Sequence, residues 1–164
     1  MVDTSSRVMG TEESYSTTTT KIHPGPVSRS LFVIKKAEKV DVFGSDDIIR
    51  YGQKVKIEMN PYLFKKPLFL SSQPLSPNVF SPISRLQECS MNARNSYAGT
   101  WVIDHIDPNF RYENQGKPVE IADPILIRHA STSHYLATDN VQIINDFGKE
   151  CEVSVNSFAT KNRS

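Results

Sequence analysis

An internal repeat constrains the fold of this chain more than any other feature of its sequence. Five short motifs recur in the same order in the second half, at offsets of 69, 61, 64, 66 and 62 residues, and small loop insertions account for the drift. A unit of this kind cannot bury its own apolar face, so it must close against copies of itself. The paired segments are Leu31–Ile34 with Thr100–Ile103, Ile49–Tyr51 with Phe110–Tyr112, Gly52–Ile57 with Gly116–Ile121, Phe69–Ser72 with Tyr135–Thr138, and Gln87–Cys89 with Lys149–Cys151.

The residues inside each unit favour strands over helices. The chain has 13 Val and 13 Ile against 8 Leu and 7 Ala, with 19 Ser and 10 Pro, a balance typical of strands joined by turns. Short apolar runs recur at a spacing of roughly 8 to 12 residues, which predicts an all-β barrel or sandwich. The predicted strands are Leu31–Ile34, Val55–Met59, Leu68–Leu70, Leu86–Met91, Trp101–Ile103, Ile125–Ile127, Tyr135–Ala137, Val141–Ile144 and Cys151–Val155.

The length and a change in composition at Leu31 predict one domain with tails. A chain of 164 residues corresponds to about one ordinary domain. Residues 1–30 are rich in Thr, Ser and Pro and lack periodic apolar positions, so we expect an extended or disordered arm that gains order on a partner. Residues 31–158 would form the domain, with repeats at about 31–91 and 100–155, and residues 159–164 would form a tail.

The order of the motifs resembles the β-trefoil of the MIR-like type. In that fold an aromatic strand, a Tyr-Gly-x-x-Val turn and a Tyr-Leu-Ser-like strand recur three times around a pseudo-threefold axis. Two of the three copies are visible in this sequence, so the resemblance implies a β-trefoil-like barrel. The residues that it places in the structural core of the repeat are Phe32, Tyr51, Gly52, Leu70, Trp101, Tyr112, Gly116 and Leu136.

The sequence is also similar to one protein family over about Leu31 to Phe158. The similarity is to the C-terminal two-thirds of the cilia- and flagella-associated protein 161 family. Because that family carries a preceding segment with the first trefoil repeat, we expect this repeat to be missing from the sequence or supplied by a different chain. The similar segments are Ile49–Gln53, Leu68–Ser72, Leu86–Glu88, Trp101–Tyr112 and Phe147–Val153.

The resemblance implies a structural function without enzymatic activity and without a cofactor. It implies a microtubule inner protein of motile cilia and flagella, which stabilises the axonemal doublet microtubule from within its lumen. The expected location is therefore the cytoplasm, in the cytoskeleton of the cilium axoneme. The expected partners are the α/β-tubulin lattice and other microtubule inner proteins.

Charge and hydropathy argue against nucleic acid and membrane partners. The 19 Lys and Arg nearly balance the 18 Asp and Glu, so no bulk charge attracts a polyanion. No stretch approaches the roughly 18 apolar residues of a membrane span, and residues 1–20 contain no apolar leader region. A modest basic cluster fits either a solvated surface or a contact with acidic tubulin, and it comprises Lys35, Lys36, Lys39, Lys65 and Lys66.

A soluble trefoil that binds a sugar or a phosphorylated ligand is the alternative function. Such a protein would need a polar pocket with convergent Arg or Lys side chains. The Gln-x-Trp motif that sugar-binding trefoils often carry does not occur in this sequence.

The cysteines and histidines provide weak candidates for chemistry. A cysteine nucleophile, Cys89 or Cys151, would need a positioned base such as His105, His129 or His134. Both cysteines occupy the same repeat position, as structural residues would. His129 and His134 flank a predicted hairpin loop, and two histidines without a third ligand favour a solvated loop over a metal or anion site. We therefore expect neither catalysis nor a bound metal.

Overall fold

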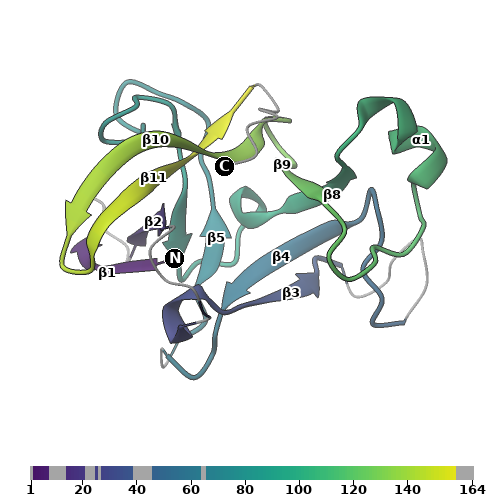
Figure 1. Ribbon diagram of the computed structural model, residues 1–164, viewed down its shortest axis with the longest axis horizontal. Helices are drawn as coiled ribbons and strands as arrows, with labels where there is room; N and C mark the ends of the chain where they lie inside the picture. The colour runs from purple at the N-terminus through teal and green to yellow at the C-terminus, as the bar shows by residue number, and fades with distance from the viewer. Residues whose placement is uncertain are drawn as a thin grey trace.

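The computed structural model consists mainly of β-strands (Figure 1). It describes residues 2–7, 14–20, 25, 27–38, 46–63 and 66–157. The predicted all-β class is confirmed. The helical elements in these ranges are short, and none is long and apolar enough to cross a membrane; they are η1 (Ser28–Ser30), η2 (Tyr97–Gly99), η3 (Pro108–Phe110) and α1 (Arg111–Asn114). The strands are β1 (Val2–Arg7), β2 (Ser14–Thr19), β3 (Phe32–Lys36), β4 (Lys54–Met59), β5 (Phe69–Ser71), β6 (Gln87–Glu88), β7 (Ser90–Asn92), β8 (Trp101–His105), β9 (Ile125–His129), β10 (Tyr135–Asn145) and β11 (Gly148–Asn156).

Antiparallel pairing closes a ring of these strands into a barrel. Around the ring the order is β2, β7, β5, β4, β8, β9, β10 and β11, and β11 pairs in turn with β2. The closing register aligns Cys151 with Thr19 and Glu152 with Thr18. Outside this ring, β1 pairs with β2, β3 with β4 and β6 with β11. Closure satisfies the backbone groups that would otherwise form exposed strand edges.

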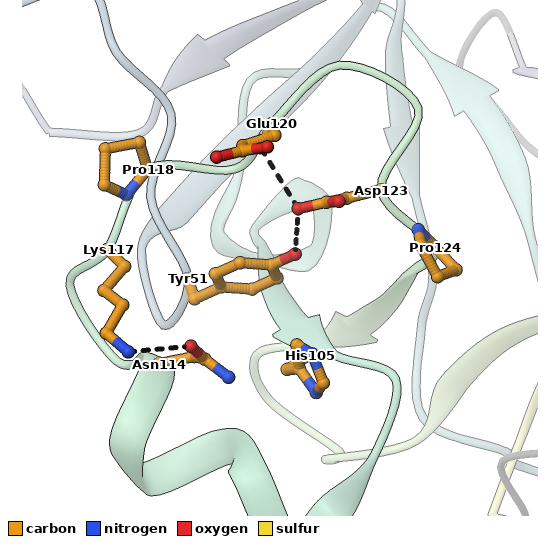
Figure 2. A pocket seen from close by; sticks show the side chains of 8 residues that line it. All are labelled: Tyr51, His105, Asn114, Lys117, Pro118, Glu120, Asp123 and Pro124. Atoms are coloured by element: carbon orange, nitrogen blue, oxygen red, sulfur yellow. Dashed lines mark hydrogen bonds between the residues drawn. The ribbon is translucent and has the colours of Figure 1, made fainter.

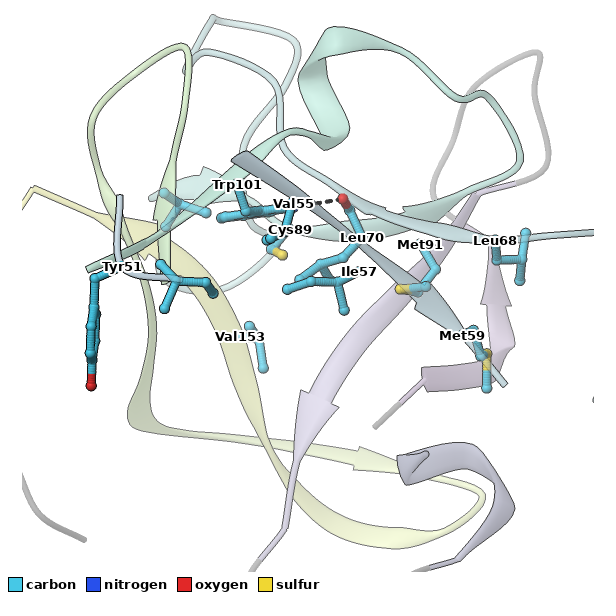
Figure 3. Close-up of a cluster of buried hydrophobic side chains, with 12 residues drawn as sticks. Tyr51, Val55, Ile57, Met59, Leu68, Leu70, Cys89, Met91, Trp101 and Val153 are labelled. Carbon is cyan, nitrogen blue, oxygen red and sulfur yellow. Dashed lines mark hydrogen bonds between the residues drawn. The ribbon is translucent and has the colours of Figure 1, made fainter. Parts of the chain in front are cut away.

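Apolar side chains from alternate strand positions fill the interior. In β4, Val55, Ile57 and Met59 are buried, whereas Lys54 is exposed and Lys56 is half-buried. Trp101 in β8 is fully buried in the same cluster (Figure 3). Its indole N–H donates a hydrogen bond of 2.8 Å to the carbonyl of Leu70, so the polar group of this large core side chain has a partner.

The two glycine turns of the repeat lie side by side. Gly52 and Gly116 both adopt the left-handed region, with φ of +79° and +82°, which residues with a Cβ atom rarely adopt. The Tyr51 N–H donates to the Lys117 carbonyl at 3.0 Å, and the Gly116 N–H donates to the Tyr51 carbonyl at 2.9 Å. The repeat motif therefore marks two turns with the same backbone conformation in direct contact.

The two copies diverge immediately after these turns. Strand β4 follows Gly52, but residues 117–124 form a loop whose ladder contact is a single bridge between Pro118 and Arg50. Pro118 stands where the first copy has Lys54, and proline cannot donate the ladder hydrogen bond that a strand needs. The segment of the second copy that matches β4 in the repeat is therefore an exposed loop.

The expected repeat-core positions have different surroundings in the two copies. Phe32 and Tyr112 differ from the expectation because their exposed fractions are 37% and 89%. Phe32 lies on β3 outside the ring, whereas its counterpart Trp101 lies on β8 inside it; Tyr112 lies on α1. Of the expected core residues, Tyr51, Leu70 and Trp101 lie in the buried cluster, and Leu136 packs against it.

The segment expected to be an arm contributes a strand to the barrel. Strand β2 pairs with both β7 and β11, and Thr17 and Thr18 are buried. The Thr17 hydroxyl donates to the Cys89 carbonyl at 2.8 Å, so burial leaves this polar side chain paired. Threonine favours strands because its Cβ is branched. The polar composition of residues 1–30 predicted an arm because it was weighed without this preference. The predicted tail at residues 159–164 lies outside the described residues.

Candidate functional site

A pocket of about 320 Å³ opens beside the paired glycine turns (Figure 2). Its walls come from the turn before β4, the end of β8, the end of α1 and the loop at 117–124. The repeat motif thus builds both the turn that carries Tyr51 and the loop opposite it. The lining residues are Tyr51, His105, Asn114, Lys117, Pro118, Glu120, Asp123 and Pro124.

Tyr51 is the buried residue of this pocket, with 5% of its surface exposed. Its hydroxyl donates a hydrogen bond of 3.0 Å to Oδ2 of Asp123, and the backbone N–H of Glu120 donates to the same oxygen at 3.2 Å. Burial raises the pKa of Tyr51, as do the hydrogen bond to Asp123 and the negative charges of Asp123 and Glu120. The phenol therefore stays protonated and holds Asp123 in place.

His105 forms a second aromatic wall. Its ring meets Tyr51 edge-on at a centroid distance of 5.5 Å and meets Phe110 in the same manner at 6.2 Å. The backbone N–H of Asp107 donates to Nδ1 of His105 at 3.1 Å. The carbonyl oxygen of Asp107 lies 3.2 Å from the same ring nitrogen. These contacts fix the ring beside the Tyr51 phenol.

The pocket carries more negative than positive charge. Glu120 and Asp123 are exposed carboxylates, and the loop between them bends at Ala122 with φ of +71°, an uncommon conformation for a residue other than glycine. Lys117 is the cation among the lining residues, and its ammonium donates to the Asn114 side-chain oxygen at 3.1 Å. Among the described residues, no group of three or more His, Cys, Asp and Glu side chains could hold a metal ion.

The two histidines considered for a metal or anion site belong to a buried hydrogen-bond network. His129 is fully buried, and its Nε2 donates to the Ala98 carbonyl at 2.9 Å, so Nδ1 is free to accept from the Thr132 hydroxyl at 2.9 Å. Gln87 connects this ring to His134, with its amide nitrogen 3.3 Å from His129 Nδ1 and its oxygen 3.2 Å from His134 Nδ1. Burial lowers the pKa of His129. The network therefore holds a neutral imidazole beside Trp101, at a ring distance of 5.0 Å.

The cysteines do not share an environment, although they match in the repeat. Cys89 is buried, and burial raises the pKa of its thiol to about 12. A thiol with that pKa carries almost no thiolate near neutral pH, and the thiolate is the nucleophile. Cys151 is half-buried in β11. Cys89 is thus a core residue rather than a reactive one.

Two described lysines of the predicted basic cluster, Lys35 and Lys36, form separate ion pairs. Lys35 lies 2.5 Å from Oε2 of Glu58, and Lys36 lies 3.1 Å from Oδ1 of Asp46. Because successive strand residues point to opposite faces, β3 directs these two lysines apart. Lys66 lies in the loop before β5. Lys39 and Lys65 lie outside the described residues.

Sequence reasoning found part of the pocket and missed the rest. Tyr51 was expected as a repeat-core residue, and His105 was considered as the base for a cysteine nucleophile. Glu120 lay in the repeat segment Gly116–Ile121 without an assigned role, and Asp123 carried no motif, although Asp123-Pro124 is a turn signal of the same kind as Asp107-Pro108. That signal would have placed a loop here but not its carboxylates beside Tyr51.

Solved structures share this fold at low sequence identity. The crystal structure of an SDF2-like protein from Arabidopsis thaliana matches with a TM-score of 0.61 at 19% identity, over 91% of this chain and 73% of that one. A protein of unknown function from Caenorhabditis elegans matches with a TM-score of 0.72 at 21% identity, over 97% of this chain and 80% of that one. Identities this low support the fold and nothing further.

Sequence comparison identifies the family. A protein named cilia- and flagella-associated protein 161 from Danio rerio is 32% identical over 142 residues, which is 85% of this chain and 45% of that protein. Its namesake from Bos taurus is 31% identical over 139 residues, or 84% and 42% of the respective chains. This chain thus spans less than half the length of these relatives. The family model described as "Cilia- and flagella-associated protein 161-like domain" matches residues 6–163, and the chain therefore belongs to that family.

Proposed function

We propose that this chain is a non-enzymatic structural component of motile cilia and flagella. The observation that carries the proposal is the family match over residues 6–163, together with relatives whose names associate them with cilia and flagella. In the finer form of the proposal, the protein is a microtubule inner protein in the lumen of the axonemal doublet. There the barrel fills a cleft between protofilaments, contacts the α/β-tubulin lattice and neighbouring inner proteins, and stabilises the doublet.

The exposed face of β3 supports a role in assembly. Leu31, Phe32, Val33 and Ile34 are all at least 37% exposed, and β3 pairs only with β4 among the described strands. Natural proteins rarely leave an apolar edge strand uncovered. We assign this strand to the contact with a neighbouring inner protein.

The MIR-like β-trefoil is the finer description of the fold that we propose. The adjacent Gly52 and Gly116 turns, with nearly equal φ, fit two of three pseudosymmetric elements. A structure of a full-length relative is expected to show a third turn of this kind beside them. A longer chain whose extra residues formed a separate domain, away from both turns, would contradict the trefoil.

Incorporation into doublets tests the proposed function directly. A tagged copy of the chain, produced in cells with motile cilia, should remain with isolated doublets after a salt wash that removes external axonemal proteins. It should be released only when the doublet wall is opened, and a map of the assembly in place should show the barrel in the lumen. A folded chain that failed to associate with doublets, or left with the external proteins, would refute the proposal.

The ligand-binding alternative has a distinct test. A trefoil that binds a sugar or a phosphorylated ligand is expected to have a polar pocket with convergent cations, whereas the pocket beside Tyr51 has two carboxylates and one lysine. Inorganic phosphate and simple sugars are therefore expected to leave the thermal unfolding midpoint of the chain unchanged. A saturable increase in the midpoint with either kind of compound would favour the alternative.

A further inference from the structure

The pocket beside Tyr51 combines two aromatic rings with carboxylates. The buried phenol and the His105 ring form its walls, and Asp123 is held against the phenol by a 3.0 Å hydrogen bond. Within the part of the chain that the structure describes, Asp123 Oδ1 and both carboxylate oxygens of Glu120 accept no hydrogen bond. Aromatic rings beside carboxylates whose oxygens can still accept hydrogen bonds form an environment that favours a cation.

The charge of the lining also favours a cation over an anion. Lys117 donates to Asn114 and is outnumbered by Glu120 and Asp123. The raised pKa of Tyr51, caused first by burial and then by Asp123 and the charge of Glu120, is consistent with a negative potential at the phenol. The carboxylates of Glu120 and Asp123 would repel an anionic ligand in this pocket and attract a cation.

The surroundings of the pocket indicate a side chain of a protein rather than a free small molecule. Its volume of about 320 Å³ lies within the roughly 300–1,000 Å³ of ligand pockets, so the exposed residues beside it decide between the two. Ile121, between the two carboxylates, is completely exposed, and Phe110, against His105, is 48% exposed. Exposed apolar side chains beside a charged pocket are typical of a protein interaction surface, where a central anchor is surrounded by further contacts.

We propose that this pocket binds the guanidinium of an arginine side chain presented by a partner protein, with Asp123 and Glu120 as acceptors and the half-buried His105 ring as the stacking surface. Arginine suits this arrangement better than lysine because its planar fork donates to two acceptors at once and stacks on aromatic rings. The inference goes beyond the ciliary proposal and does not depend on it, since its test uses the 164-residue chain alone.

Titration with two matched compounds tests the charge requirement. We would add N-acetyl-arginine amide to the isotopically labelled chain and follow the backbone amides of residues 51, 105 and 120–123 by NMR. Saturable shifts confined to these amides are expected. N-acetyl-citrulline amide has the same shape without the charge, and it should bind roughly tenfold more weakly or worse, because a hydrogen bond to a charged group contributes more than a neutral one. Equal binding of the citrulline amide, or no saturable shift with the arginine amide, would each overturn the proposal.

A conservative variant tests the acceptor. Asp123→Asn retains an oxygen that can accept from the Tyr51 hydroxyl but removes the charge, so the fold should persist while affinity for the arginine amide falls roughly tenfold. Asp146→Asn is the matched control, because Asp146 is an exposed carboxylate at the turn between β10 and β11, and it should bind like the unaltered chain. If Asp123→Asn were folded by its NMR spectrum and bound as tightly as the control, the proposal would fail.

Discussion

Nη2 of Arg29 lies 2.5 Å from Oε1 of Glu150 and forms a salt bridge between η1 and strand β11. The Glu150 carboxylate is almost fully buried and also accepts hydrogen bonds from the Thr18 hydroxyl at 2.6 Å and the Asn145 amide at 2.8 Å. The Arg29 guanidinium lies 3.8 Å from the ring centroid of Phe147. One carboxylate thus joins β2, η1 and the hairpin of β10 and β11.

Replacement of Glu150 should therefore be among the most destabilising single changes. Glu150→Ala is expected to lower the free energy of unfolding by roughly 3–5 kcal/mol, because it leaves the largely buried Arg29 guanidinium without its partner charge. Chemical denaturation near neutral pH measures the difference. The control is Glu113→Ala, at an exposed position of α1, which should change the free energy by no more than about 0.5 kcal/mol. A loss below about 1 kcal/mol for Glu150→Ala would contradict this role of the salt bridge.

The second prediction concerns the stability of the glycine turn before β4. Gly52→Ala should cost about 1–2 kcal/mol of unfolding free energy, because the left-handed conformation is unfavourable for a residue with a Cβ atom. A Cβ at this position would also lie 3.1 Å from the Gln115 side chain. Gly25→Ala is the control, since nothing lies within 4 Å of its Cβ position. Thermal unfolding of both variants should show a lower midpoint for Gly52→Ala alone, and equal midpoints would mean that the turn relaxes.

The repeat could be recognised in the sequence because each of its motifs is a short local segment. The pocket could not be recognised there, because it depends on contacts between the two copies. The motif at Gly52 and Gly116 predicted two equivalent turns, and φ values above zero at both explain why glycine recurs there. No pattern indicated that the Gly116 N–H would donate to the Tyr51 carbonyl, and this long-range contact positions the pocket. Residue type also failed to separate Phe32 from Trp101, since burial depends on whether a strand lies inside the ring. The β2 strand was missed because buried threonines pair their hydroxyls, which the composition of a segment does not reveal.

The buried His129 predicts a stability that depends on pH. Burial lowers the pKa of its imidazole from the ordinary value of 6.5, so the unfolded chain binds a proton at a higher pH than the folded chain does. This contribution to stability is complete above about pH 6.5 and is lost as the pH falls toward the folded pKa. Denaturant unfolding at about pH 8 and about pH 5.5 should show the decrease. An NMR titration should show His129 still neutral in the folded chain just below pH 6.5, and protonation at or above that value would contradict the prediction.

The exposed β3 strand predicts a variant that loses assembly without losing its fold. Val33 is 40% exposed and lies opposite Glu58 in the β3–β4 register, so Val33→Lys places a cation near a carboxylate and removes an apolar contact from the edge. Its free energy of unfolding should change by less than about 1 kcal/mol, whereas its retention on salt-washed doublets should fall several-fold, because the substitution puts an ammonium group that must lose water into an apolar contact. Ile144→Lys, at an 80% exposed position of β10, provides the same chemical change away from β3 and should be retained normally. Normal retention of Val33→Lys would remove β3 from the proposed contact, and equal loss for both variants would indicate sensitivity to added charge rather than a surface specific to β3.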